Sequence, residues 1–218
     1  MSDPVWDEDG FGPRDVQPQT GATREALDLI QRYIEMLDVW RTRLNLIGPS
    51  ERRHIWRRHV LDSIQLLNLL DAGEENIADL GAGAGFPGII LACALKGRGR
   101  ANISLVEKSP RKAEFLATVV SELGLPAAIL NGRIEEPAFP PAPVDLVTAR
   151  AVAPLSRLLG YAEPWLKPGG RCLFLKGREA TTELTLARES WTFGLSVRAS
   201  ASSPDGQVLA ISSLRRRT

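Results

Sequence analysis

The stretch Ile77-Ala-Asp-Leu-Gly-Ala-Gly-Ala-Gly-Phe-Pro-Gly88 decides the fold of this chain. It begins as a short apolar run, which is typical of a buried strand, and it ends where an apolar helix begins at Gly88. Between the two, glycines at positions 81, 83 and 85 let the backbone turn sharply and approach a ligand without interference from a Cβ atom. A strand, a glycine-rich turn and a helix in this order indicate an α/β sheet that binds a nucleoside-containing ligand.

Short apolar runs and helical stretches alternate after this point. The further runs expected as buried strands are Ile103–Val106, Ala127–Leu130, Leu146–Ala149 and Cys172–Leu175. The helices expected between them are Gly88–Leu95, Ser109–Leu123, Pro154–Leu166 and 179–190. Such alternation predicts a parallel sheet covered by helices on both faces. The last two runs, 193–199 and 207–214, flank a Ser-Pro-Asp-Gly turn, so we expect an antiparallel hairpin to complete the sheet.

Two amphipathic helices are expected before the sheet. The first begins after Thr23, a suitable N-cap, and the second follows Gly48-Pro49-Ser50 and carries Trp56, Val60, Ile64 and Leu67 on one side. We assign residues 21–70 to an N-terminal helical extension packed on the core and residues 71–218 to the main domain. Residues 1–20 contain five acidic side chains, several Gly and Pro residues and few aliphatic ones, which predicts a disordered acidic tail.

The composition describes a soluble globular protein, with 44% hydrophobic and 24% charged residues among 218. The longest apolar run, Ile89–Leu95, is far shorter than the roughly 20 residues that span a bilayer. Residues 1–20 lack the basic start and apolar stretch of a signal peptide, so we expect the protein in the cytoplasm. Cys93 and Cys172 both lie inside apolar runs, which favours reduced thiols in the core over a disulfide.

Positive charge is concentrated in two places. The stretch Ser50–Leu61 contains four arginines, at 52, 53, 57 and 58, and the chain ends with Arg215, Arg216 and Arg217. Because the acids of residues 1–20 leave the rest of the chain net basic, these clusters favour a polyanionic partner. The alternative is that they only solvate a helix face and a frayed C-terminus.

Two carboxylates bear on the choice of cofactor. Glu107 follows the second expected strand, where it can accept hydrogen bonds from both ribose hydroxyls, and Gly83, Gly85 and Gly88 match the dinucleotide pattern GxGxxG. That pattern alone does not identify the cofactor. Asp79, at the tip of the first strand, suits the cationic amino-acid end of S-adenosylmethionine and would repel a pyrophosphate. An alternative role for Asp79 is to cap the glycine turn with its side chain.

At this point the chain resembles the bacterial glucose-inhibited division protein B family, the small-subunit (16S) ribosomal RNA guanine-N7 methyltransferases. The resemblance covers about residues 45–177. The motifs that carry it are Asn45-Leu46, Arg58-His59, Leu61-Asp62-Ser63, Asp79 to Gly88, Leu105-Val-Glu107, Lys112, Phe115-Leu116, Arg133-Ile-Glu135, Arg150-Ala151 and Lys176-Gly177. The acidic residues 1–20 and the three C-terminal arginines match no motif of the family.

The resemblance implies a Rossmann-like class I methyltransferase fold with a seven-stranded, mainly parallel sheet. It implies S-adenosylmethionine as methyl donor, S-adenosylhomocysteine as product, no metal, and a guanine in the decoding region of 16S rRNA as target. Carried over by motif, Gly81 and Phe86 line the methionine side of the cofactor, Ile134 and Glu135 lie beside the adenine, and Arg150 lies at the mouth of the pocket. We expect a monomer whose partner is the small-subunit rRNA or the assembling 30S subunit.

The chemistry of guanine N7 requires no acid or base from the protein, because N7 already offers a lone pair in the plane of the ring. We therefore assign Arg133, Arg150 and Lys176 to positioning phosphates and guanine O6, and no side chain to proton transfer. His59, Asp62 and Ser63 share one helical face, but adjacent turns of a helix provide no oxyanion hole. They are interpreted as a local hydrogen-bond cluster or a wall of the cofactor site. His54 and His59 point apart, which makes metal binding unlikely.

Other classes of function remain open from the sequence. A methyltransferase of a small molecule would have an enclosed apolar pocket and no use for the arginine clusters. An NAD-binding oxidoreductase would need a substrate domain, for which little chain is left. A non-enzymatic nucleotide-binding module is the fourth class.

Overall fold

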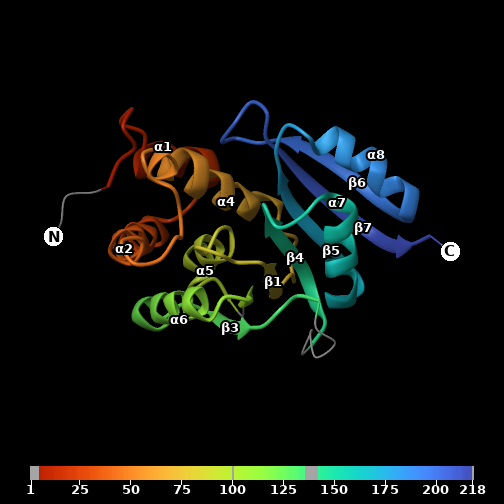
Figure 1. The fold of residues 1–218 in the computed structure, drawn as a ribbon. Helices are drawn as coiled ribbons and strands as arrows, with labels where there is room; N and C mark the ends of the chain where they lie inside the picture. The colour runs from red at the N-terminus through yellow and green to blue at the C-terminus, as the bar shows by residue number, and fades with distance from the viewer. Residues whose placement is uncertain (1–4, 100, 136–141, 218) are drawn as a thin grey trace.

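The computed structural model describes residues 5–99, 101–135 and 142–217, and its centre is a seven-stranded sheet (Figure 1). The strand order is β3-β2-β1-β4-β5-β7-β6. The strands are β1 (Asn76–Leu80), β2 (Asn102–Glu107), β3 (Ala127–Asn131), β4 (Val144–Arg150), β5 (Leu166–Lys176), β6 (Trp191–Ala199) and β7 (Gln207–Arg216). The first five are parallel, and β7 pairs antiparallel with both β5 and β6. The predicted parallel sheet with a C-terminal hairpin is confirmed.

The register of the parallel strands brings their carboxyl ends to one edge. Leu80, the last residue of β1, pairs with Val106 on one side and Ala149 on the other. The residues that follow these strands therefore meet at the edge where open α/β sheets bind ligands. From β1 the sheet grows first toward β2 and β3, and β4 then begins the other half on the opposite side of β1. The strand order therefore changes direction between β1 and β4, which are neighbours.

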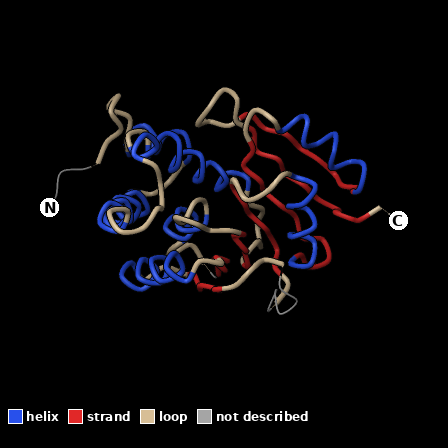
Figure 2. The backbone as a smooth tube through the Cα atoms, in the orientation of Figure 1, coloured by secondary structure: helices blue, strands red, loops and turns tan. Residues whose placement is uncertain are grey.

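Two hydrophobic clusters cover the two faces of the sheet. One face packs against α2 (Arg24–Trp40), α5 (Gly88–Leu95) and α6 (Pro110–Leu123). The other face packs against α7 (Leu155–Ala162), the short 3-10 helix η3 (Glu163–Trp165) and α8 (Ala180–Ser190). Figure 2 shows the sheet strands running between these two groups of helices. The N-terminal helices and the sheet share one continuous core, and the division at residue 70 stays a prediction.

The ends of several helices follow the predicted sequence signals. Thr23 caps α2 by accepting a hydrogen bond from the amide of Ala26, and Pro110 follows the N-cap residue Ser109 of α6. Gly124 ends α6 in a left-handed conformation, with φ of 57°, which glycine adopts at little cost.

Residues 5–20 differ from the predicted disordered tail. They include a helix, α1 (Pro13–Thr20), and place Phe11 and Val16 in the hydrophobic core. The Asp7 side chain is buried and accepts hydrogen bonds from the amides of Trp56 and Arg57, both at 2.9 Å. The tail prediction is therefore corrected for these residues, because long-range contacts supply the stabilisation that the local composition lacks. Residues 1–4 lie outside the described part.

The second predicted helix is broken into four short pieces. These are α3 (Pro49–Arg52), the π-helix η1 (Trp56–Leu61), α4 (Asp62–Ile64) and the 3-10 helix η2 (Gln65–Leu69). In a continuous α-helix the amides of Trp56 and Arg57 would bond to the carbonyls four residues earlier. Here Asp7 accepts both amides, and the carbonyl of Arg53 accepts the amide of Glu8 instead. The N-terminal segment thus replaces the helical hydrogen bonds at the break.

The two cysteines are free thiols buried in the core, as predicted. Burial raises the pKa of Cys93 to about 12, so this thiol is protonated at neutral pH. Among the described residues, no helix is both long and apolar enough to cross a membrane.

Candidate functional site

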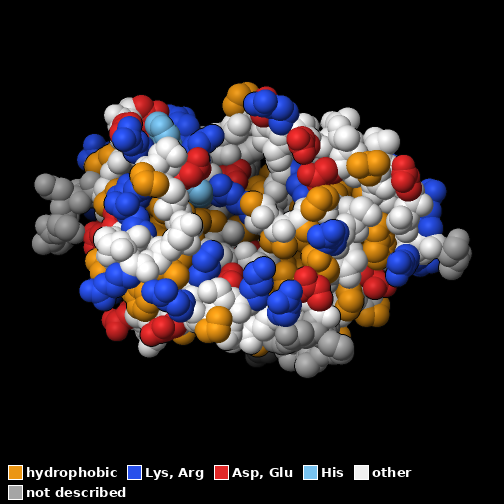
Figure 3. Space-filling model, in the orientation of Figure 1, with side chains coloured by type: hydrophobic (Ala, Val, Ile, Leu, Met, Phe, Trp, Pro, Cys, Tyr) orange, Lys and Arg blue, Asp and Glu red, His pale blue; other side chains and the backbone are white. Residues whose placement is uncertain are grey.

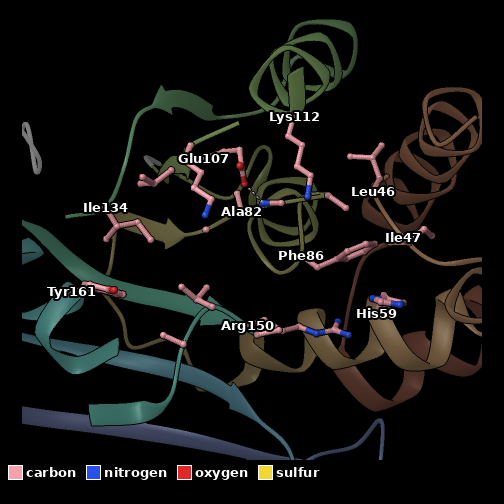
Figure 4. A pocket seen from close by; sticks show the side chains of 18 of the residues that line it. Leu46, Ile47, His59, Ala82, Phe86, Glu107, Lys112, Ile134, Arg150 and Tyr161 are labelled. Atoms are coloured by element: carbon pink, nitrogen blue, oxygen red, sulfur yellow. Dashed lines mark hydrogen bonds between the residues drawn. The ribbon is translucent and has the colours of Figure 1, made fainter. Parts of the chain in front are cut away.

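A cavity of about 550 Å³ opens at the carboxyl edge of β1, β2 and β4 (Figure 4). The glycine loop after β1, the end of β2, the segment after β3 and the loop after β4 all contribute to its wall. The residues with a predicted role that line it are Gly81, Gly83, Phe86, Glu107, Ile134, Glu135 and Arg150. The fold therefore brings together residues that lie up to 115 positions apart in the sequence, as Leu46 and Tyr161 do.

The glycine loop adopts conformations that favour glycine. Gly81, Gly83 and Gly85 have φ of 71°, 57° and 108°. A Cβ atom on Gly81 would lie 2.8 Å from Val152 on the loop after β4, so the two loops approach too closely for any larger residue. From the other side, the Tyr33 hydroxyl on α2 donates to the carbonyl of Ala84 at 2.6 Å. Helix α2 thus fixes the loop from beneath.

Glu107 connects the glycine loop to the end of β2. Its carboxylate accepts hydrogen bonds from the amide of Gly83, at 2.9 Å, and from the amide of Ser109, at 2.8 Å. Figure 4 shows this carboxylate beside the glycine loop at the middle of the cavity wall. The two backbone bonds orient the carboxylate before any ligand arrives.

Asp79 lies beneath the cavity and does not line it. Its carboxylate is fully buried and accepts hydrogen bonds from the amide of Gly88, at 2.9 Å, and the hydroxyl of Thr148, at 3.1 Å. Burial raises the pKa of Asp79 from its usual 3.8 to about 7. This arrangement matches the alternative interpretation, in which Asp79 caps the turn, rather than direct contact with a cofactor.

The end of the cavity near the N-terminal helices is aromatic. The ring of Phe86 packs edge-on against Tyr33, with centroids 5.6 Å apart, and lies 4.8 Å from the ring of His59. His59 is buried, and its Nε2 atom lies 3.2 Å from the carboxylate of Glu51, although neither ring nitrogen has a well-aligned hydrogen bond to a described residue. Burial, reinforced by the charges of Arg150 and Arg58, lowers the pKa of His59 to about 3, so the ring is neutral. His59 is therefore a wall of the cavity, one of the two roles predicted for it.

Arg150 stands at the boundary between this cavity and a second one of about 270 Å³. Its guanidinium lies 3.4 Å from the carboxylate of Asp62. Asp62 in turn accepts hydrogen bonds from the hydroxyls of Ser200 and Ser202 in the turn between β6 and β7. These contacts link α4 to the C-terminal hairpin across the end of β4. They are long-range, and Asp62 does not join His59 and Ser63 in the predicted local cluster, in which only the Ser63 hydroxyl donates to the carbonyl of His59.

The sequence matches a family model described as rRNA small subunit methyltransferase G over residues 26–207. The chain belongs to this family. A ribosomal RNA small subunit methyltransferase G from Paramagnetospirillum magneticum is 43% identical over 206 residues, which cover 94% of this chain and 98% of the relative. The protein of the same name from Caulobacter vibrioides (strain NA1000 / CB15N) is 44% identical over 213 residues, which cover 97% of this chain and 94% of the relative.

Solved structures of methyltransferases share the fold of this family member at low sequence identity. A predicted O-methyltransferase from Agrobacterium tumefaciens matches with a TM-score of 0.56 and 20% identity, over 73% of this chain and 80% of that one. The TYW2 protein of M. jannaschii, solved in complex with AdoMet, matches with a TM-score of 0.50 and 17% identity, over 68% and 72%. The predicted class I methyltransferase fold is confirmed.

Lys176 was predicted to position the RNA, and in the structure its ammonium is bonded to protein groups. Its side chain is only 8% exposed, pairs with Glu183 at 2.7 Å and donates to the carbonyl of Ala153 at 2.7 Å. Glu183 also accepts the amide of Leu155, at 2.6 Å. The pair therefore anchors the loop after β4, in which Ala151 has a φ of 54°, a strained value for a residue with a side chain. Lys176 also lines the second cavity beside Arg150, and its role in positioning RNA stays a prediction.

Arg133 precedes Ile134 but does not itself line the cavity, and its side chain is exposed. The structure therefore brings Arg150 to the cavity wall and leaves Arg133 outside it. Glu135 lines the cavity with an exposed side chain, and residues 136–141, which follow it, lie outside the described part.

Some residues of the cavity were not singled out from the sequence. Arg157 and Tyr161 lie on α7, and Lys108 directly follows Glu107. The sequence feature that could have identified these residues is their position along the chain, because residues that follow β2 and β4 reach the ligand-binding edge of an α/β sheet. Among the described residues, no group of three or more histidine, cysteine, aspartate or glutamate side chains is arranged to hold a metal ion.

Proposed function

We propose that the protein transfers a methyl group from S-adenosylmethionine to N7 of a guanine in the decoding region of 16S rRNA. Membership of the rRNA small subunit methyltransferase G family supports an RNA substrate. The observation that carries the proposal is the cavity at the ends of β1, β2 and β4, in which a glycine loop faces an oriented carboxylate.

The residues of the cavity fit the chemical parts of this cofactor. Glu107 would accept the ribose hydroxyls, while Val106 and Ile134 offer apolar surface and Glu135 lies at the same end for the adenine. Phe86 and Gly81 lie at the opposite side, where His59 also lines the wall and would face the amino-acid end. The cofactor supplies an activated methyl group on a sulfonium, and the protein's task is to hold it against the base.

Catalysis would then rest on positioning and on exclusion of water, because N7 needs no deprotonation. The loop Ala151–Ala153 faces the glycine loop across the cavity, and the Lys176–Glu183 pair fixes it through Ala153 and Leu155. A neutral His59 adds no positive charge that would oppose the charge moving from sulfur to the base. Arg150, at the mouth, would contact guanine O6 or a phosphate.

The cavity does not resemble the enclosed apolar pocket expected of an enzyme that methylates a small hydrophobic molecule. Four cationic side chains line it, together with the carboxylates of Glu107 and Glu135. A basic, open site favours the polyanionic substrate. The proposal further places the protein in the cytoplasm, as a monomer acting on 16S rRNA or on the assembling 30S subunit.

Titration calorimetry with S-adenosylhomocysteine and with NADH separates the classes of function. We expect saturable binding of S-adenosylhomocysteine and none of NADH, because the chain belongs to a family of methyltransferases. Binding of NADH in preference to S-adenosylhomocysteine would contradict the proposal.

A further inference from the structure

The arginines at 52, 53, 57 and 58, the cluster that favoured a polyanionic partner in the sequence, are all neutralised by acids. Arg52 bonds to Asp38 through two nitrogens, and Arg58 lies 2.7 Å from Glu51. The other two pair with the acidic N-terminal segment. Arg53 lies 3.3 Å from Glu8 and Arg57 lies 3.0 Å from Asp9.

The cations around the cavity show the opposite pattern. Lys108, Lys112 and Arg157 line the cavity, and none of them forms an ion pair with a described residue. We call these three residues the mouth cations. Lys108 and Arg157 are exposed, and Lys112 is partly buried. Figure 3 shows Lys and Arg side chains gathered around the hollow in the middle of this face, and in Figure 4 Lys112 extends toward the cavity.

Two of the mouth cations occupy unfavourable positions in their own helices. Lys112 lies in the first turn of α6 and Arg157 in the first turn of α7. The N-terminus of a helix carries partial positive charge and disfavours a cation by a few tenths of a kcal/mol or more. Neither first turn contains an acid of its own, and the carboxylates nearest to these N-termini, Glu107 and Glu183, bond to the backbone amides of Ser109 and Leu155 and form no ion pair with Lys112 or Arg157. Unpaired cations at two helix N-termini beside one cavity form a site that is complementary to anions.

The basic surface continues away from the cavity over α7. Arg157 and Tyr161 also line a neighbouring groove of about 700 Å³, together with Trp191 and Arg216. An aromatic ring with a polar hydroxyl between two arginines suits a single strand of nucleic acid, whose phosphates bind cations and whose bases stack on rings. Arg216 thereby joins the cavity mouth in one surface, in which Glu163 is the one acid among the described residues that line the groove.

We infer that the RNA backbone docks on the mouth cations and follows the α7 groove toward Arg216, and that the cluster at 52–58 does not form the docking surface. The inference rests on the proposed function and names the surface that this function uses. Mouth cations are available to phosphates at once, whereas each arginine of the cluster must first lose a carboxylate partner. The acids of the N-terminal segment serve the fold of η1 and compete with RNA for Arg53 and Arg57.

Two triple variants that remove the same charge test this inference. One is Lys108→Gln, Lys112→Gln, Arg157→Gln, and the matched control is Arg52→Gln, Arg53→Gln, Arg57→Gln. The affinity of each for a 16S rRNA transcript is measured over a series of salt concentrations. Since each neutralised phosphate contributes roughly 0.7 to the slope of log K against log salt for single strands, the mouth variant should lose about 2 from the slope. The slope of the control variant should fall by less than about 0.5, which is less than the contribution of one phosphate contact.

The affinity for S-adenosylhomocysteine, measured in parallel, separates two kinds of failure. If the wild-type protein does not bind S-adenosylhomocysteine, the proposed function itself fails. If it binds both this ligand and RNA, but the control loses as much slope as the mouth variant, the docking surface is overturned while the function stands. Should thermal unfolding show that the control is not folded, Arg53→Gln with Arg57→Gln replaces it and is compared with Lys108→Gln with Arg157→Gln.

Discussion

Gly83 is the residue at which the backbone itself forms the binding site. Its φ of 57° is left-handed, and its amide donates to Glu107. We expect Gly83→Val to lower the affinity for S-adenosylhomocysteine at least tenfold, because a branched side chain disfavours this φ and moves the amide away from the carboxylate. Calorimetry measures the change.

Gly97 offers a matched control. It also has a positive φ, 78°, and open space around a built Cβ atom, but it does not line the cavity. Gly97→Val should cost comparable stability and leave the affinity for S-adenosylhomocysteine unchanged. Equal losses of affinity in both variants would show that the effect of Gly83→Val is general strain.

Asp79 should make the stability of the protein depend on pH. Its pKa is raised to about 7 in the folded protein, so between pH 4 and 7 the folded state holds a proton that the unfolded state has released. The contribution of Asp79 to stability is therefore greatest at low pH and declines as pH rises toward 7, by about 4 kcal/mol in total. Asp79→Asn removes this dependence.

The measurement is urea unfolding of the wild-type and Asp79→Asn proteins across this pH range. The wild-type free energy of unfolding should decline relative to that of the variant as pH rises, and the difference should level off above about pH 7, the value to which burial raises this pKa. A difference that stays constant with pH would mean that Asp79 keeps an ordinary pKa, despite its burial.

At the scale of elements, the Lys176–Glu183 pair joins β5 and α8 to the loop after β4. Removing one partner leaves the other charge buried, so Lys176→Met and Glu183→Gln should each destabilise the protein by about 2–4 kcal/mol. The double variant should cost clearly less than the sum, because neither charge is then orphaned. Chemical denaturation gives these values, and strict additivity would refute the coupling.

The N-terminal segment is the element whose role the structure changes most. Asp7, only 4% exposed, accepts the amides of Trp56 and Arg57, so Asp7→Ala should cost about 2 kcal/mol of stability in urea unfolding. Asp9→Ala, which removes an exposed ion pair with Arg57 and the hydrogen bond from the Phe11 amide, is the control and should cost clearly less than Asp7→Ala. Similar losses from both would argue against a capping role for Asp7.

Hydrophobic periodicity and glycine placement predicted the sheet, the hairpin and the position of the cavity, because these features depend on local sequence. The break in the second helix depends on Asp7, which lies 49 positions before Trp56, so no local pattern announces it. The same holds for Lys176, whose partner Glu183 is near in sequence but whose acceptor, Ala153, is not. Asp79 had two interpretations because burial, which decides between them, is a tertiary property.

At the scale of the whole molecule, the N-terminal helices and the sheet act together on one site. Tyr33 on α2 holds the glycine loop, η1 supplies His59, and the β6–β7 turn holds Asp62 beside Arg150. Elements from the beginning, middle and end of the chain therefore shape the same cavity. This explains how one sheet with an appended helical layer can form both the cavity proposed for the cofactor and the basic face proposed for RNA.

The central claim, methyl transfer to guanine N7 of small-subunit rRNA, is tested most directly by analysing the modified nucleoside. Purified protein is incubated with methyl-labelled S-adenosylmethionine and 16S rRNA or 30S subunits isolated from a strain that lacks this gene, and the RNA is digested to nucleosides. We predict that the label is recovered as 7-methylguanosine at a single site in the decoding region. Label in another nucleoside, or no transfer to either RNA substrate while S-adenosylhomocysteine binds, would contradict the account.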